Sequence, residues 1–331
     1  MNDNYNYTTR QDNENIYQTI KRKDNYFLHI LLFVLTFLSV TLGGVFWAGQ
    51  DPFQLLNFTS GLLYAVLIIT VISFHEFGHY FAAKIHKVDV TLPYYIPFPF
   101  IMLNPFGTMG AVIRMKSPAY DRKALFDIAI AGPIAGWIVS VIFLIIGFLT
   151  LPSIDYLYSI HPEYETEGVK VGGFSFGYNI VFWILEKTLT SSPGVFMPPM
   201  NEVYHYPFLC VGWFGLLITA LNMMPVGQLD GGHIAYAMFG KNHKWLAYTT
   251  FGLLLFFGLL GLLPFFGINS SVGSVNWLLW VILIALIIKI KHPDTVTNFH
   301  EPLTKGRIIL GWISYLIFII SFCPVPFTGD F

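Results

Sequence analysis

The chain has 331 residues, of which 55% are hydrophobic and 11% are charged, and its net charge is −1. Ordinary soluble domains carry about 25% charged residues, so this composition excludes a soluble globular protein and predicts a multi-pass membrane protein. Two cysteines, Cys210 and Cys323, exclude a disulfide framework and a thiolate-rich metal site. The sequence shows no basic patch of the kind that binds nucleic acid, so we expect no nucleic-acid partner.

Seven apolar segments are long enough to cross a lipid bilayer as helices. They comprise residues 26–47, 61–86, 123–151, 206–226, 245–266, 273–290 and 306–323. The predicted fold is therefore an all-α multi-pass membrane protein with about seven transmembrane helices. Residues 1–25 are polar and are expected to form a disordered tail. Residues 26–331 are expected to form a single membrane-embedded domain, because the longest loop, 152–205, is too short for a substantial core of its own.

The lysines and arginines predict how these helices are oriented. If residues 1–25 lie in the cytoplasm and the helices alternate in direction, 16 of the 18 basic residues fall on the cytoplasmic side. Lys170 and Lys187 then fall on the outer side. We therefore expect an integral membrane protein with a cytoplasmic N-terminus.

One apolar stretch cannot cross the membrane as a helix. Residues 91–106 contain four prolines, and the stretch begins and ends on the predicted cytoplasmic side. Prolines at this density forbid a regular helix, which predicts a re-entrant or interfacial loop. Residues 107–115 follow with a pair of glycines and several β-branched residues, a composition that favours a short β-strand.

The candidate chemistry begins with His75-Glu76-Phe77-Gly78-His79, which lies within the apolar segment 61–86. Two histidines four residues apart face the same side of a helix, so both imidazoles can reach one Zn²⁺. Glu76 is then placed to act on a metal-bound water. The alternative is that these side chains bond to backbone or water in a packed bundle. Burying three polar residues in a membrane span without a shared partner is costly, so a metal site, in the cytoplasmic half of the span, is favoured.

A third metal ligand is expected on another helix, because catalytic zinc sites usually have three protein ligands. The loop that follows segment 206–226 contains two candidates, Asp230 and His233. The pair Gly231-Gly232 should allow a sharp turn that returns Asp230 toward the bundle. Residue chemistry favours Asp230 but leaves His233 open.

Two separated motifs resemble those of one known family. They are His75-Glu76-Phe77-Gly78-His79 and Asn222-x-x-Pro225-x-x-x-Leu229-Asp230-Gly231. In this order they resemble the site-2 protease family of intramembrane zinc metalloproteases, peptidase family M50, and the resemblance covers residues 61–232. No insert of PDZ-domain size separates the motifs, so the chain looks more like the PDZ-less plastid and bacterial branch that includes the ethylene-dependent gravitropism proteins.

The resemblance implies a role for each polar residue of the two motifs. His75, His79 and Asp230 would be the ligands of one Zn²⁺ per chain, which favours Asp230 over its rival. Glu76 would be the base that activates water. Asn222 would hold the substrate or stabilise the oxyanion; a helix-packing amide is the alternative for this residue.

Two further segments resemble the same family. Residues 131–136, Ala-Gly-Pro-Ile-Ala-Gly, resemble its Gly-Pro-x-Ala-Gly helix, and a packing role is expected for them because the glycines permit close helix contact. Gly107, Thr108, Met109 and Gly110 resemble its membrane-embedded strand, whose edge can bind an unwound substrate by strand addition. An ordinary connector is the alternative for this segment.

The resulting hypothesis is a zinc metalloendopeptidase that hydrolyses peptide bonds in or beside transmembrane segments. The resemblance implies regulated intramembrane proteolysis, in the bilayer, of a single-pass membrane protein already cut by another protease. Two alternatives stay open. A divalent-metal transporter is disfavoured because no further intramembrane carboxylates lead to the cluster, and a catalytically idle scaffold that binds membrane helices is disfavoured because Glu76 and the ligands are intact.

The other histidines are expected to be solvated or interfacial side chains rather than ligands, because they lie near predicted helix ends and loops. They are His29, His86, His161, His205, His243, His292 and His300.

Overall fold

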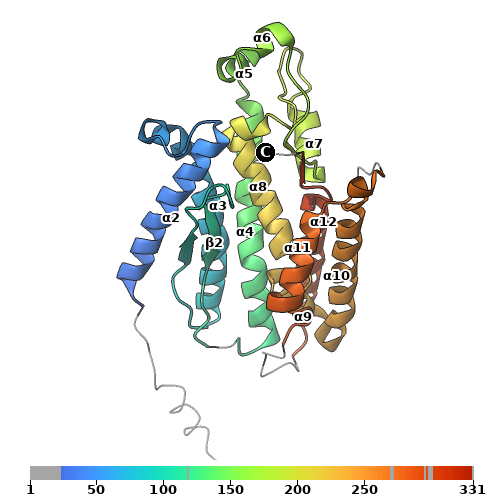
Figure 1. Cartoon of the computed structure of the whole chain (residues 1–331). Helices are drawn as coiled ribbons and strands as arrows, with labels where there is room; N and C mark the ends of the chain where they lie inside the picture. The colour runs from blue at the N-terminus through green and yellow to red at the C-terminus, as the bar shows by residue number, and fades with distance from the viewer. Residues whose placement is uncertain (1–23, 118, 269–271, 294–295, 297–300, 330–331) are drawn as a thin grey trace, which may run out of the picture.

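Long apolar helices make up most of the protein (Figure 1). A computed structural model describes residues 24–117, 119–268, 272–293, 296 and 301–329. The predicted disordered tail therefore lies almost wholly outside the described residues. The main helices are α2 (Tyr26–Trp47), α3 (Leu62–Ile85), α4 (Arg122–Leu149), α8 (Pro207–Asn222), α9 (Asp230–Phe239), α10 (His243–Leu260), α11 (Asn276–Leu283) and α12 (Lys305–Ser321).

Within the described residues, four stretches are long and apolar enough to cross a membrane. They are Tyr26–Trp47, Leu55–Ile85, Arg122–Leu149 and Asp230–Phe266. The other three predicted segments form shorter helices: α8 has 16 residues, α12 has 17, and α11 has 8 and continues into a π-helical turn, Ile284–Ile288. A 16-residue helix reaches about 24 Å, less than the roughly 30 Å of hydrocarbon in a bilayer. The mostly helical fold is thus confirmed, and the count of seven spans stays a prediction.

Helix α4 lies in the middle of the bundle, with α3 and α8 packed against it (Figure 1). The largest cluster of buried apolar side chains joins these three helices, with Ile68, Leu144 and Phe214 fully or almost fully buried. Outer faces carry apolar side chains that are largely exposed, such as Phe27 on α2 and Trp312 on α12. Exposed apolar faces on long helices are typical of contact with lipid.

A β-hairpin stands beside α2 and α3. Strand β1 (Tyr94–Pro97) pairs antiparallel with β2 (Thr108–Val112), so the proline-rich stretch contributes a strand of its own where the sequence predicted only one strand, in 107–115. Gly107, the residue directly before β2, has a φ of +73°, a conformation that favours glycine. The Ser39 hydroxyl of α2 donates to the Gly107 carbonyl over 2.5 Å, and the Thr108 hydroxyl donates to the Ile96 carbonyl over 2.8 Å.

The loop 152–205 lies at the end of the bundle opposite to α9 (Figure 1). It contains the helices α5 (Ile154–Ile160), α6 (Tyr164–Glu167) and α7 (Ile180–Leu189), the strand β3 (Ser175–Phe176) and the 3₁₀ turn η2 (Val203–His205). Strand β3 pairs with β4 (Phe327–Thr328). Phe182 of α7 packs against Phe148 of α4, with ring centroids 5.0 Å apart, which fixes the loop on the bundle.

The remaining histidines were expected to be solvated or interfacial, and four of them are not solvated. His29, His205, His243 and His292 are buried, each 6% exposed or less. In the loop, burial and the neighbouring His161 ring together lower the pKa of His205 to about 4. His86 and His161 are half-buried, and His300 lies outside the described residues.

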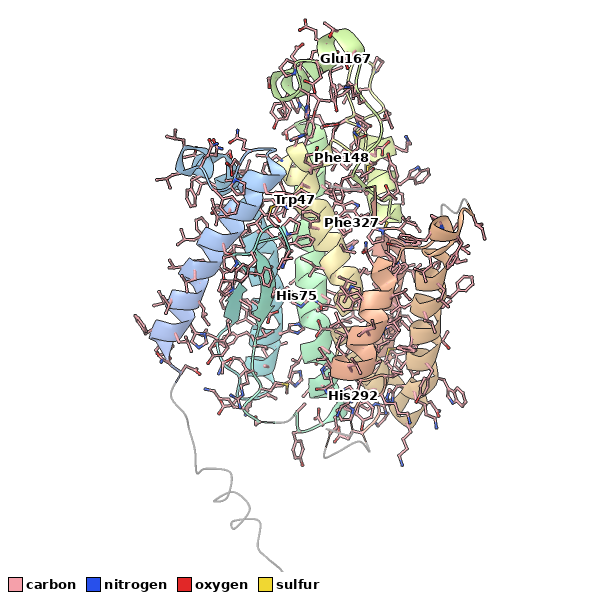
Figure 2. All side chains as sticks on the ribbon, viewed as in Figure 1. Trp47, His75, Phe148, Glu167, His292 and Phe327 are labelled. Atoms are coloured by element: carbon pink, nitrogen blue, oxygen red, sulfur yellow. The ribbon has the colours of Figure 1, made fainter. Side chains whose placement is uncertain are left out.

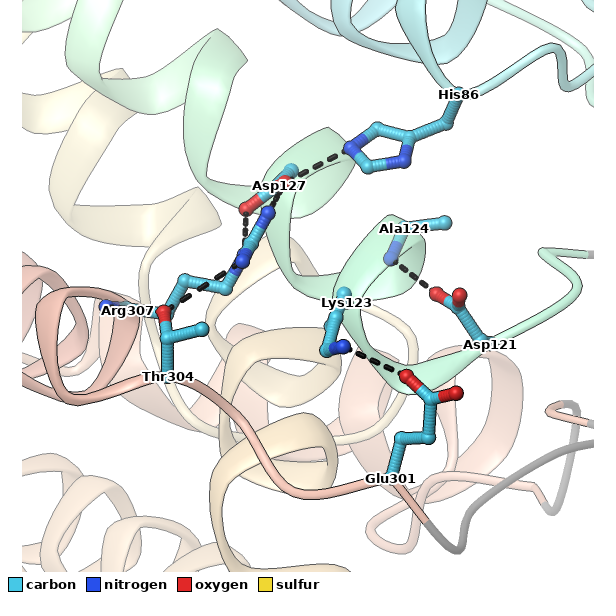
Figure 3. A network of polar contacts seen from close by, with 8 residues as sticks. All are labelled: His86, Asp121, Lys123, Ala124, Asp127, Glu301, Thr304 and Arg307. Atoms are coloured by element: carbon cyan, nitrogen blue, oxygen red, sulfur yellow. Dashed lines mark hydrogen bonds and ion pairs between the residues drawn. The ribbon is translucent and has the colours of Figure 1, made fainter.

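A polar network joins the ends of three helices (Figure 3). Arg307 of α12 donates from Nε and Nη2 to the two carboxylate oxygens of Asp127 on α4, over 2.8 and 2.6 Å. The His86 ring, directly after α3, lies 2.8 Å from the same carboxylate. A two-pronged arginine–carboxylate pair fixes orientation as well as distance. The network therefore fixes the register between the ends of α3, α4 and α12.

Candidate metal centre

Three predicted site residues meet inside the bundle, where Figure 2 labels His75. His75 and His79 lie one turn apart on α3, and Asp230 is the first residue of α9. The two histidine Nε2 atoms are 3.1 Å apart, and Asp230 Oδ2 lies 3.4 Å from His75 Nε2 and 3.3 Å from His79 Nε2. Ligand atoms around a tetrahedral Zn²⁺ are about 3.3 Å apart. The two imidazole nitrogens and the carboxylate oxygen thus fit a Zn²⁺ site.

The connection between α8 and α9 brings Asp230 to the histidines. Helix α8 ends at Asn222, and the chain turns at Gly227, whose φ is +55°. Gly231 and Gly232, expected to form this turn, instead belong to the first turn of α9. A Cβ at Gly231 would overlap the Met223 carbonyl, so the glycine allows the two backbones to approach. The predicted return of the chain is confirmed, with the turn a few residues earlier.

A backbone carbonyl orients one of the imidazoles. His79 Nδ1 lies 2.7 Å from the Ile128 carbonyl oxygen of α4, which can only accept a hydrogen bond. Nδ1 therefore carries the proton and Nε2 keeps its lone pair, the form that binds a metal. Gly132, one turn further along α4, packs directly against the His79 ring, and a Cβ there would overlap the ring.

We expect Gly132→Ala to displace the His79 ring and to weaken zinc binding by about 10–100-fold, the usual loss when the outer support of a ligand is removed. Zinc affinity measured by competition with a chelator tests this. Gly252→Ala on α10 is the matched control, because nothing lies within 4 Å of a Cβ at that position. Equal zinc affinity in the two variants would contradict a positioning role for Gly132.

Glu76 lies between the two histidines in sequence and faces the hairpin. Its Oε2 atom accepts a hydrogen bond from the Ile113 amide, 3.0 Å away, directly after β2. The carboxylate opens into a cavity of about 300 Å³ that also contains the three ligand side chains. The hairpin residues that line this cavity are Ala111, Val112, Ile113 and Met115. Of the predicted strand segment, Thr108, Met109 and Gly110 form the start of β2 and Gly107 directly precedes it. The predicted binding of substrate to this segment stays a prediction.

The other two predicted candidates also line the cavity. Asn222 is the last residue of α8, and its Nδ2 atom lies 3.5 Å from His75 Nε2. His233 Nδ1 instead lies 2.5 Å from His292 Nε2, so this ring has a partner outside the cluster. The structure thus groups Asp230, and not His233, with the two α3 histidines.

Sequence reasoning missed the contributions of the Ile113 amide and the Ile128 carbonyl. Both are backbone atoms, and the side chains of isoleucine give no signal of such a contact. The helix that contains residues 131–136 was expected to serve packing only; the structure shows that its packing is against the candidate ligands.

Residues 63–263 match the family model described as peptidase family M50. The chain belongs to this family. Among similar M50 proteins is the "Probable zinc metalloprotease EGY1, chloroplastic" of Arabidopsis thaliana, 28% identical over 258 residues, 78% of this chain and 42% of the relative. The EGY1 protein of Oryza sativa subsp. japonica is 34% identical over 220 residues, 66% of this chain and 33% of the relative. The EGY2 protein of Oryza sativa subsp. indica is 29% identical over 282 residues, 85% of this chain and 45% of the relative.

These comparisons confirm the family resemblance that the two motifs indicated. The similar proteins also carry EGY names. The chain spans less than half the length of each of these three M50 relatives.

Proposed function

We propose that this M50 protein is a zinc metalloendopeptidase that cuts peptide bonds in or beside transmembrane segments. One observation carries the proposal: two imidazoles and a carboxylate spaced for one Zn²⁺ share a cavity with a fourth polar side chain, Glu76. The names of the EGY relatives support zinc as the metal. The cluster lies within stretches apolar enough to cross a membrane, Leu55–Ile85 and Asp230–Phe266, which supports an intramembrane site.

His75, His79 and Asp230 would hold one Zn²⁺, which when bound supplies a Lewis acid that makes water nucleophilic near neutral pH. Glu76 accepts the proton of the attacking water and delivers it to the leaving amine. The Ile113 amide holds the Glu76 carboxylate in place through Oε2 and leaves Oε1 free of that contact. Asn222, with its amide nitrogen toward the cluster, donates a hydrogen bond to the substrate carbonyl as negative charge develops there.

Strand β2 would present the substrate. Its last residues, Ala111 and Val112, line the cavity, and among the described residues it pairs with β1 along one edge and with no strand along the other. An extended peptide added to this edge would place its backbone beside Glu76. A helical substrate must unwind for this, because its peptide bonds are hydrogen-bonded within the helix. A Cβ at Gly110 would have no neighbouring atom within 4 Å, so the space beside this residue of β2 is open.

The membrane arrangement is part of the proposal. Seven transmembrane helices with a cytoplasmic N-terminus would put 16 of 18 basic residues in the cytoplasm and the metal centre toward that side. The substrate would be a single-pass membrane protein trimmed beforehand by another protease, so that its shortened segment can enter between the helices and the hairpin.

Zinc removal tests the proposed activity. The purified chain in proteoliposomes should cleave a model transmembrane substrate. A strong chelator such as 1,10-phenanthroline should abolish this cleavage, and added Zn²⁺ should restore it. A transporter of divalent metal would instead move zinc across the liposome membrane without producing fragments, and a scaffold would bind the substrate intact with or without chelator. Either of these results would overturn the protease proposal.

A further inference from the structure

A second group of potential ligands lies in the loop, at the opposite end of the protein from α9. His161 is the residue after α5, Glu202 precedes η2, and His205 is the last residue of η2. Among the described residues this group and the candidate metal centre are the two sets of three or more side chains that could hold a metal ion. Figure 2 labels Glu167, near the tip of the same loop, far from His75.

The three ligand atoms are spaced for one small cation. His161 Nε2 and His205 Nε2 are 3.1 Å apart, and Glu202 Oε2 lies 3.6 Å from each of them. A triangle with sides of 3.1, 3.6 and 3.6 Å has a circumradius of about 2.0 Å, and Zn–N and Zn–O bonds are about 2.0–2.2 Å long. A cation in or slightly above the plane of the three atoms can therefore bind all of them at normal bond lengths.

The surroundings of Glu202 aim one oxygen at this position. Its Oε1 atom accepts hydrogen bonds from the Tyr164 hydroxyl, 2.9 Å away, and from the Asn201 amide nitrogen, 2.8 Å away. The Glu202 side chain is only 3% exposed, and its buried Oε2 atom has no hydrogen-bond partner in the described part of the chain. Burying a carboxylate oxygen without a hydrogen-bond donor costs free energy. A cation bound at this atom would offset that cost.

A hydrogen bond between the two imidazoles is the competing explanation. Their Nε2 atoms are close enough for it, and one neutral ring could donate to the other. That bond satisfies the two nitrogens but leaves Glu202 Oε2 without a donor, since both nitrogens lie beyond hydrogen-bond distance from it. A bound cation satisfies all three atoms at once.

We propose that His161, Glu202 and His205 form a second, regulatory or structural binding site for a divalent transition-metal cation, represented by Zn²⁺. Two imidazole nitrogens and one carboxylate oxygen are typical zinc ligands, whereas Mg²⁺ and Ca²⁺ favour sets made of oxygen alone. His161 has an outer partner for its second nitrogen, because Nδ1 lies 3.4 Å from Glu163 Oε1. His205 Nδ1 is buried without a hydrogen bond among the described residues. Lack of such support commonly costs 10–100-fold in affinity, so this zinc should exchange more readily than that of the central site.

The site joins two parts of the loop that are distant in sequence. His161 directly follows α5, while Glu202 and His205 lie five and two residues before Pro207, the first residue of α8. A direct contact already connects the same parts, since the Tyr156 hydroxyl donates to the His205 carbonyl over 2.8 Å. Bound zinc would add a link at this junction and stabilise the loop against the start of α8 by binding the folded form.

Metal counting on the full chain tests the proposal. The purified protein, stripped by a chelator and reloaded with Zn²⁺, should hold two zinc ions per chain. His161→Ala and Glu202→Gln should each hold one, and so should His75→Ala, which removes a ligand of the central site. The double variant His75→Ala/His161→Ala should hold none. Glu165→Ala is the matched control: this exposed glutamate lies in α6 of the same loop, and its variant should hold two.

The zinc that remains in a single variant also reports that the variant is folded. A rise in Tm on adding Zn²⁺ to His75→Ala, absent in the double variant, would confirm binding in the loop independently of activity. One zinc in the wild type, kept in His161→Ala and Glu202→Gln and lost in His75→Ala, would overturn the loop site and leave the proposed protease intact. Zinc lost in His161→Ala but kept in His75→Ala would overturn the central site instead.

Discussion

Glu76→Gln is expected to lower the rate of peptide cleavage by about 10²–10⁴-fold, the usual contribution of a positioned general base, while zinc content stays unchanged. Glutamine has the same shape, and its amide oxygen can still accept the hydrogen bond that the Ile113 amide makes to Glu76. The substitution therefore removes the proton acceptor and leaves the cavity intact. Cleavage of a model transmembrane substrate and zinc content, measured on the same preparations, test this expectation.

The control for Glu76→Gln is Glu165→Gln, the same chemical change on the exposed surface of α6. It should retain full cleavage by the central site. Cleavage by Glu76→Gln at the wild-type rate would show that another group accepts the proton. Substrate binding without cleavage in both the wild type and Glu76→Gln would instead favour the idle scaffold.

The sequence predicted the candidate site well because two local patterns define it. Histidines one turn apart must share a helix face, and a broken helix rich in glycine can return a carboxylate to the bundle, so His75, His79 and Asp230 could be grouped before their positions were known. Residue chemistry alone did not separate Asp230 from His233. In the structure, His233 is excluded from the cluster because its ring contacts His292, 59 positions away along the chain. No local pattern contains that contact.

Other features depend on contacts that composition does not encode. The length of an apolar segment does not reveal where its helix ends. The predicted span was 206–226, whereas α8 ends at Asn222 and has 16 residues. The loop histidines were expected to be solvated or interfacial, since they lie near predicted helix ends and loops. His161 and His205 lie 44 positions apart, and only folding of the loop places their rings 3.1 Å from each other.

Asp230→Ala is expected to lose the central zinc and all cleavage, whereas His233→Ala should keep the central zinc. Asp230 Oδ2 lies 3.4 Å from His75 Nε2 and 3.3 Å from His79 Nε2, and alanine supplies no ligand in its place. Two imidazoles alone leave a zinc site incomplete, so affinity should fall by more than the 10–100-fold that loss of an outer partner costs.

The comparison of Asp230→Ala with His233→Ala decides between the two ligands that residue chemistry left open. Both positions lie in the first turns of α9 and line the same cavity, so damage to folding should affect the two variants alike. To isolate the central site, zinc is counted in the His161→Ala background, where the loop no longer contributes. Zinc kept by Asp230→Ala and lost by His233→Ala would mean that the His233 ring leaves His292 to bind the metal, and that the carboxylate of Asp230 only orients the two histidines.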